Sequence, residues 1–279
     1  MNQRSVFTNE AMDEDQPPTV HSTRPEQLCS PRLLAAGFEH AFFTRRGGVS
    51  PPPWDTLSFA VSTGDSPDNV LENRRRAAAL LGVAPSALFY LSQVHGVAHR
   101  VLGPTDDPEA VIRDVGDITL SAAPGIACGV RTADCAPVLL GDRRSGAVLA
   151  IHSGWRGTVQ NVVGAGIAAL RALVEQPLDA CAAIGPHIER CCFEVGEDVA
   201  AQLALASSAG DAVVVRAGPK PRVDLRPVLR AQLRHAGIAD RDIEDVAGCT
   251  VCDSGAFFSF RRDGARSGRL LSAIVSRGR

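Results

Sequence analysis

Two histidines and one cysteine lie at the ends of apolar segments of this sequence. His95 and His152 each close an apolar run, and Cys135 comes just before another. Imidazole and thiolate groups bind Zn²⁺ tetrahedrally, and a site with three protein ligands keeps its fourth position open for chemistry. His95, Cys135 and His152 therefore form a candidate catalytic zinc site, provided that the fold joins residues 40 and 17 positions apart.

Three other interpretations of these residues remain open. In a structural one, the histidines are hydrogen-bonded strand ends and Cys135 is a small buried side chain. In a metal-free enzyme, Cys135 would be a nucleophile of lowered pKa and His152 its base. One cysteine and two histidines also match a blue-copper ligand set, so copper is the alternative metal. Seven histidines without a His-x-His pair are too few for an additional trinuclear copper cluster, which disfavours multicopper laccase chemistry.

Several arginines are candidates for binding an anion. Arg45 and Arg46 precede two glycines in a loop that ends in a run of prolines, and guanidinium groups match the oxygens of phosphate. Arg156 and the pair Arg261-Arg262 are the other candidates. The alternative for each is a solvated surface charge.

The remaining cysteines give no complete ligand motif. Cys249 and Cys252 have the spacing of a redox or zinc half-site, but no second Cys-x-x-Cys completes it. Cys191 and Cys192 lie in the turn-rich loop 185–196, for which we expect a structural role. We interpret most of the eight cysteines as buried reduced thiols.

Composition restricts the class of protein. The 279 residues are 45% hydrophobic and 22% charged, values typical of a globular chain, and one domain is expected. A net charge of -2 disfavours nucleic-acid binding and leaves small anionic ligands possible. No run of 18 apolar residues and no apolar core of a signal peptide occur, so we expect a cytoplasmic protein without a membrane partner.

The pattern of elements predicts a mixed fold. Residues 1–27 are rich in proline and acidic residues and are expected to form a disordered tail before a domain at 28–279. Predicted strands cover 38–44, 88–94, 126–130, 138–140, 147–151, 180–184, 212–215, 248–251 and 270–275. Predicted helices cover 66–81, 158–173, 199–205 and 225–235. This interleaving indicates a compact α+β (mixed α/β) single domain with mixed sheets.

Several segments together resemble one known family. They are Thr44 to Ser50, Gln93 to Gly96, Thr132 to Pro137, His152 to Gly157, Ile184 to Gly196 and Phe257 to Arg269. The chain is similar, over about residues 32–275, to the laccase-domain family, long labelled polyphenol oxidases and regarded as purine nucleoside phosphorylases. The ordered set of segments is highly specific.

The resemblance implies a four-layer α/β/β/α fold with zinc held at His95, Cys135 and His152. It also implies phosphorolysis of adenosine, inosine and methylthioadenosine to a free base and a sugar 1-phosphate, together with deamination of adenosine. Some members are tied to peptidoglycan editing. The partners expected are therefore a purine nucleoside and phosphate, with the oligomeric state open.

The chain departs from the family pattern at two places, which bear on substrate contacts. Ser153 replaces the usual Ala, and the segment 57–65 lacks the Asn and His that are usual there.

The roles expected in the reaction follow from the chemistry. For deamination, zinc lowers the pKa of a water ligand towards about 7 and so provides a nucleophile for C6 of adenine. Asp134 or Glu194 would carry the protons. For phosphorolysis, an anion site is needed near the metal, with Arg45 and Arg46 as first choice and Arg261 second.

Overall fold

The computed structural model describes residues 24–206, 208 and 210–278. Its helices are α1 (Pro31–Ala35), α2 (Pro67–Leu80), α3 (Pro108–Val111), α4 (Trp155–Val159), α5 (Val162–Val174), α6 (Glu197–Leu205), α7 (Leu225–His235) and α8 (Phe260–Asp263). Its strands are β1 (Gln27–Leu28), β2 (His40–Phe43), β3 (Leu88–Phe89), β4 (His99–Val101), β5 (Ile118–Ser121), β6 (Ala127–Thr132), β7 (Ala136–Asp142), β8 (Val148–Ser153), β9 (Ala180–Ile184), β10 (Val214–Val215), β11 (Arg222–Val223), β12 (Ile243–Asp245) and β13 (Leu270–Val275). Short 3₁₀ turns connect several of these elements.

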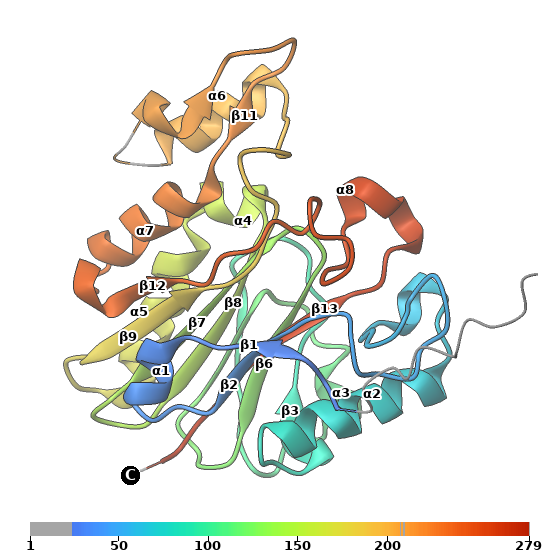
Figure 1. Ribbon diagram of the computed structural model, residues 1–279. Coiled ribbons are helices and arrows are strands. Elements are labelled where there is room, and N and C mark those ends of the chain that lie inside the picture. Colours follow the sequence, from blue (N-terminus) through green and yellow to red (C-terminus); the bar gives the residue numbers. More distant parts are fainter. Residues whose placement is uncertain (1–23, 207, 209, 279) are drawn as a thin grey trace, which may run out of the picture.

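Two mixed sheets form the centre of the molecule. One has five strands in the order β1-β2-β13-β6-β3, and the other has six in the order β12-β9-β7-β8-β5-β4. β10 and β11 form a separate antiparallel pair beside α6, in a lobe beyond one end of the sheets (Figure 1). The predicted mixed α/β architecture is therefore confirmed.

The two sheets pack face to face, and helices cover their outer faces. Phe42, Val130 and Ile274 of the five-stranded sheet share one buried cluster with Leu139 and Ala150 of the six-stranded sheet. Helices α5 and α7 cover the outside of the six-stranded sheet, and α2 covers the outside of the five-stranded sheet (Figure 1). The order of layers is helix, sheet, sheet, helix.

Burial on both faces explains the composition of the central strands. Every residue of β7, β8 and β9 is buried, and their apolar side chains run almost without interruption. One face meets the neighbouring sheet and the other meets helices, so neither face of these strands is polar.

Local signals set the ends of α2. The side chain of Ser66 accepts a hydrogen bond from the Asp68 backbone N–H, and Pro67 occupies the first turn, where its missing N–H costs nothing. Gly82, just beyond the helix, has a φ of +70°, a conformation that glycine adopts without strain. The helix predicted from this pattern is confirmed.

Other predicted elements differ from the structure. The helix expected at 158–173 is divided into α4 and α5 at Asn161, whose φ of +58° interrupts the helix and whose side chain caps α5. The strand expected at 88–94 shortens to β3, because the chain leaves β6 after Phe89. The strand expected at 212–215 starts as a 3₁₀ turn, and residues 248–251 form an isolated bridge at Cys249 instead of a strand.

Residues 24–27 were predicted to belong to the N-terminal tail, but the structure places them in the folded part of the chain. Residues 1–23 lie outside the described residues, whereas Glu26 exchanges backbone hydrogen bonds with Thr44 and Arg46. Gln27 and Leu28 pair with β2 as β1. Residues 24–27 are therefore part of the fold, because this strand edge supplies partners for their backbone. Within the described part of the chain, no helix is long and apolar enough to cross a membrane.

Because the two sheets pack closely, a cavity between them should lower the free energy of unfolding substantially. Leu139 is fully buried in that layer, so Leu139→Ala is expected to lower the free energy of unfolding by about 2–5 kcal/mol. Leu71→Ala is the matched control, because Leu71 is 58% exposed on α2. Urea unfolding of both variants measures the difference, and equal small losses would contradict the layer assignment.

Candidate metal centre and cavity

Strand pairing brings Cys135 to His152. β7 and β8 are antiparallel neighbours, with Ala136 opposite Ser153 and Pro137 opposite His152. Cys135 immediately precedes β7, and His152 is the second-last residue of β8, so this register places them side by side although they are far apart in the sequence. His152 is 3% exposed, and Cys135 is half-buried.

A buried carboxylate orients both histidines. Asp117 accepts a hydrogen bond from Nδ1 of His152 at 2.7 Å, which leaves Nε2 of that imidazole as the free ligand atom. The same carboxylate accepts the backbone N–H groups of His95 at 2.9 Å and Gly96 at 2.7 Å. The side chain of Asp117 is completely buried, so these donors are what make its negative charge tolerable there.

The three predicted ligands come together in a geometry that suits a metal ion. The ligand atoms of His95, Cys135 and His152 all lie within 4.8 Å of one another, and Sγ of Cys135 lies 3.6 Å from Nε2 of His95. Tetrahedral Zn²⁺ with usual bond lengths would place a sulfur and a nitrogen ligand about 3.6 Å apart. His95 has a φ of +63°, a strained backbone conformation that the Asp117 contacts maintain.

Cys135 and His152 shift the pKa of each other. Burial alone would raise the pKa of the Cys135 thiol, but the charge and hydrogen bond of His152, with help from His95, lower it. Burial alone would lower the pKa of His152, but Cys135 and Asp117 raise it. The site therefore favours the thiolate, which is the form of cysteine that binds metals.

Gly154 leaves room for this cluster. A Cβ atom at this position would lie 2.5 Å from Cδ2 of His95 and 2.9 Å from Sγ of Cys135. Any side chain at residue 154 would push a ligand away. Ser153 next to it, where the resemblance indicated an altered substrate contact, is fully buried and hydrogen-bonded to Thr158 at 2.8 Å.

The cluster lies in the wall of a cavity of about 550 Å³, a size that suits a small-molecule ligand. Ile188, Phe193 and Phe260 give this cavity apolar and aromatic surface. Phe260 is 52% exposed, which is unusual for a large aromatic residue and is consistent with a surface that a flat ligand covers.

Four arginines line the same cavity, namely Arg131, Arg156, Arg261 and Arg269. None of them forms an ion pair with a carboxylate of residues 24–206, 208 and 210–278. Arg131 bonds to the carbonyl oxygens of Phe59 and Leu91, and Arg269 to those of Ser267 and Gly268. Burial lowers the pKa of both Arg131 and Arg269. The described lining of the cavity therefore holds four guanidinium groups against one carboxylate, that of Asp134, and carries positive charge overall.

Asp134 lies at the cavity, and both of its carboxylate oxygens are engaged. Thr250 donates its hydroxyl to Oδ1, and the Arg261 backbone N–H donates to Oδ2, both at 2.6 Å. The residue has a φ of +94°, which holds it in a strained conformation beside Cys135. These contacts connect Cys135 to the segment that carries Arg261.

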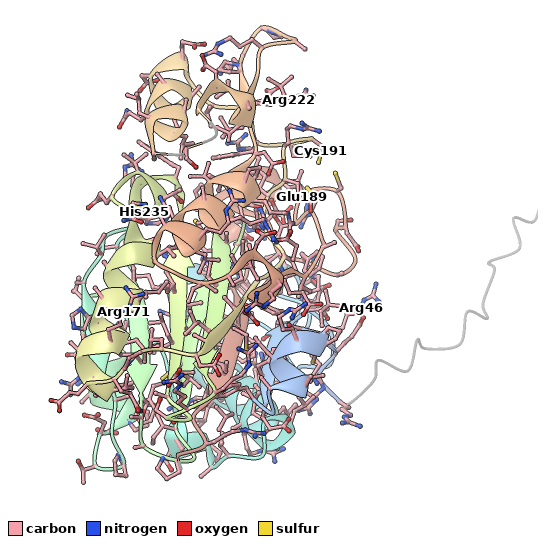
Figure 2. All side chains as sticks on the ribbon, turned by 90° about the vertical axis from the view of Figure 1, so that its left-hand side faces the viewer. Arg46, Arg171, Glu189, Cys191, Arg222 and His235 are labelled. Atoms are coloured by element: carbon pink, nitrogen blue, oxygen red, sulfur yellow. The ribbon has the colours of Figure 1, made fainter. Side chains whose placement is uncertain are left out.

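Three other predicted site residues are placed away from the cavity. Arg45 is bonded to Asp55 at 3.0 Å and lies over the ring of Phe258, and Arg46 pairs with Glu26. Figure 2 shows Arg46 extending outward at the edge of the molecule. The carboxylate of Glu194 pairs with Arg222 at 3.0 Å. Carboxylates from other segments of the chain thus bind both arginines, and the partly exposed Arg222 binds Glu194.

Sequence reasoning missed several residues that build the site. Asp117 and Arg131 lie outside every segment that the sequence singled out, while Phe260 and Arg269 lie in the segment Phe257 to Arg269 but were given no role. One feature of the sequence does point to Asp117 and Arg131. Both are charged residues within or beside apolar strands, where a charge needs a specific partner.

Fold and site together define a mixed α/β protein with a candidate three-ligand metal centre. A family model described as "Multi-copper polyphenol oxidoreductase laccase" matches residues 39–277. The chain therefore belongs to this laccase-like family.

Curated relatives extend the similarity. The chain is 37% identical over 234 residues to "Purine nucleoside phosphorylase YfiH" of Escherichia coli K12, covering 83% of this chain and 90% of that one. It is 39% identical over 236 residues to "Purine nucleoside phosphorylase" of Deinococcus radiodurans, covering 84% and 88%. Among solved structures, YlmD from Geobacillus stearothermophilus superposes with a TM-score of 0.83 at 28% identity, covering 94% of this chain and 98% of that one.

The role of Asp117 predicts the effect of its amide variant. Asp117→Asn is expected to weaken Zn²⁺ binding about 10- to 100-fold, because an amide is a poorer acceptor for the His152 N–H. Competition with a chromophoric chelator measures this affinity.

Asp142→Asn is the matched control for that experiment. Asp142 is also a fully buried carboxylate that accepts backbone N–H groups, from Ser145 and Asp179, but it lies at the opposite end of β7 from Cys135. Its variant is expected to lose stability and to keep its zinc affinity. Equal zinc affinity in the two variants would show that Asp117 does not orient a metal ligand.

Proposed function

We propose that this protein is a zinc-dependent purine nucleoside phosphorylase that acts on adenosine, inosine and methylthioadenosine and also deaminates adenosine. The observation that carries the proposal is the shared cavity, in which the cluster of His95, Cys135 and His152 lies next to arginines that form no ion pair with a carboxylate of the described residues. The names of the curated relatives support the same class of reaction.

Zinc is the proposed metal because of the donor atoms that the site offers. Two imidazoles and one thiolate, with a carboxylate behind His152, are typical of a zinc site with an open position. When bound, zinc would supply a Lewis acid that polarises an oxygen atom of substrate or water. Copper is disfavoured as a multinuclear centre, because only two imidazoles meet among the described residues that could hold a metal.

Phosphorolysis requires phosphate and nucleoside to lie together. An oxygen of phosphate forms a bond to C1′ of the ribose while the bond from C1′ to the purine breaks, and the departing base takes up a proton. We assign phosphate to Arg156, Arg261 and Arg269, because their guanidinium groups pair with no carboxylate in the described part of the chain and so can bind an anion. Arg45 and Arg46, expected from the sequence to bind this anion, are held away from the cavity by Asp55 and Glu26.

The purine is assigned to the aromatic part of the cavity. Phe260 and Phe193 offer ring faces on which a flat base can stack. Asp134, expected from sequence to move protons, is assigned a positioning role, because both of its oxygens accept hydrogen bonds from Thr250 and Arg261. Glu194 has no role in this assignment.

One observation favours a second candidate function. The lowered pKa of Cys135 and the raised pKa of His152 are also properties of a cysteine nucleophile with a histidine base. A metal-free hydrolase of this kind would lose activity to a thiol alkylator and would be indifferent to chelators. The zinc enzyme would respond to chelators and recover when zinc is returned.

Removal of one ligand tests the proposed function. Cys135→Ala is expected to lose its zinc at this site and to release adenine from adenosine and phosphate at least about 100-fold more slowly, since the Lewis acid supplies several kcal/mol. Adenine and ribose 1-phosphate are measured in phosphate buffer, and ammonia in phosphate-free buffer separates deamination from phosphorolysis.

Cys29→Ser is the control, because it removes a cysteine thiol from outside the candidate metal site. Cys29 is a half-buried free cysteine that is not part of the cluster of His95, Cys135 and His152. This variant is expected to keep zinc and activity. Adenine release by metal-free Cys135→Ala at the wild-type rate would reject the proposal.

The phosphate assignment predicts a selective change in KM. Arg261→Gln is expected to raise the KM for phosphate about tenfold or more, because a hydrogen bond to a charged group contributes about 1.5–3 kcal/mol. The KM for adenosine should change little. Arg46→Gln is the control, because Arg46 points outward and pairs with Glu26. A larger effect of Arg46→Gln than of Arg261→Gln would contradict the assignment.

A further inference from the structure

Four cysteines gather outside the cavity, at a place that the proposed reaction does not use. Cys191 and Cys192 belong to the loop after β9, and Cys249 and Cys252 to the segment after β12. Their sulfur atoms all lie within 4.8 Å of one another. Figure 2 shows sulfur atoms gathered at the labelled Cys191. The sequence offered Cys249 and Cys252 only as an incomplete half-site, and the fold supplies the other half from an adjacent pair.

The distances between these sulfurs fit a shared metal ion. Sγ of Cys191 lies 3.5 Å from the sulfurs of Cys249 and Cys252, and Sγ of Cys192 lies 3.4 Å from that of Cys252. Zn²⁺ with four thiolates at about 2.3 Å would place neighbouring sulfurs about 3.8 Å apart. A disulfide needs about 2.05 Å between its sulfurs, and all four residues are free cysteines.

The backbone presents each pair of cysteines on its own tight turn. The N–H groups of Cys192 and Phe193 both bond to the carbonyl oxygen of Glu189, and the Asp253 N–H bonds to that of Cys249. The two segments are joined directly, since the Thr250 N–H bonds to the carbonyl oxygen of His187. The arrangement is therefore held by main-chain contacts that are independent of the sulfur atoms.

Two guanidinium groups lie next to the backbone that carries the four cysteines. The guanidinium of Arg261 bonds to the carbonyl oxygen of Cys192 at 3.2 Å, and that of Arg262 bonds to the carbonyl oxygens of Thr250 and Val251 at 2.8 and 3.2 Å. Zinc with four thiolates would have a net negative charge, and Arg261 is the nearby cation that could offset part of it, since Arg262 is paired with Asp263 at 2.7 Å.

From this geometry we propose that Cys191, Cys192, Cys249 and Cys252 bind a second zinc ion as a closed, structural site. Four protein ligands leave no open position, so this ion would fasten two segments and take no part in chemistry. The fastened segment includes Thr250, which donates its hydroxyl to Asp134 beside Cys135. The site would therefore stabilise one wall of the cavity from outside. It does not depend on the proposed enzymatic function.

Zinc content tests the proposal on the full chain, purified without chelators. The wild-type protein is expected to hold two zinc ions per chain, and Cys191→Ser/Cys252→Ser to hold half as much. Cys135→Ala is expected to keep the zinc of the cysteine cluster, so failure of the three-ligand site and failure of this one are distinguishable. Cys29→Ser, which alters a free cysteine outside both clusters, is expected to keep both ions.

Alkylation of the wild-type protein gives a second test that needs no variant. Cys191 and Cys252 are exposed, so free thiols there would react at once with iodoacetamide. We expect mass spectrometry to find the four cysteines protected until a chelator removes zinc, and then modified. Rapid alkylation before chelation, or protection that only a reductant relieves, would overturn the proposal, as would unchanged zinc content in Cys191→Ser/Cys252→Ser.

Discussion

The arrangement of this site depends on the hydrogen bonds that the carboxylate of Asp117 accepts. This carboxylate is completely buried, and the imidazole of His152 and the backbone of the turn at His95 supply its hydrogen-bond donors. A buried charge of this kind is stable only when its partners stay in place. The strained backbone at His95 is therefore held by the same group that orients His152, and both imidazoles face Cys135 as a consequence.

The two sheets contribute different chemistry to the cavity. The six-stranded sheet carries Cys135 and His152 at one end of β7 and β8, while the five-stranded sheet carries Arg131 in β6 and Arg269 just before β13. The face-to-face packing of the sheets sets the separation between the ligand cluster and the arginines. A phosphorylase has to hold a nucleoside and an anion at a fixed separation, and a rigid two-sheet core is a physical means of doing so.

Much of the fold and part of the site could be predicted from the sequence. The apolar strands β7, β8 and β9 and the capped helix α2 were evident, because burial on two faces and helix capping leave local patterns. β5 was missed, since its four residues alternate apolar and hydroxyl side chains within a longer irregular segment. Arg45 and Arg46 looked free in the sequence, but carboxylates distant from them in the chain occupy their guanidinium groups.

By itself the sequence determined the candidate metal-binding side chains at His95, Cys135 and His152 and the strand ends that present them, because those depend on local composition. Only the tertiary structure decided which charged groups face the cavity and which are neutralised elsewhere, since ion pairing depends on distances in space. It also decided that two unrelated cysteine pairs would meet. No spacing rule predicts that meeting, because the two pairs are joined by the packing of loops rather than by a continuous motif.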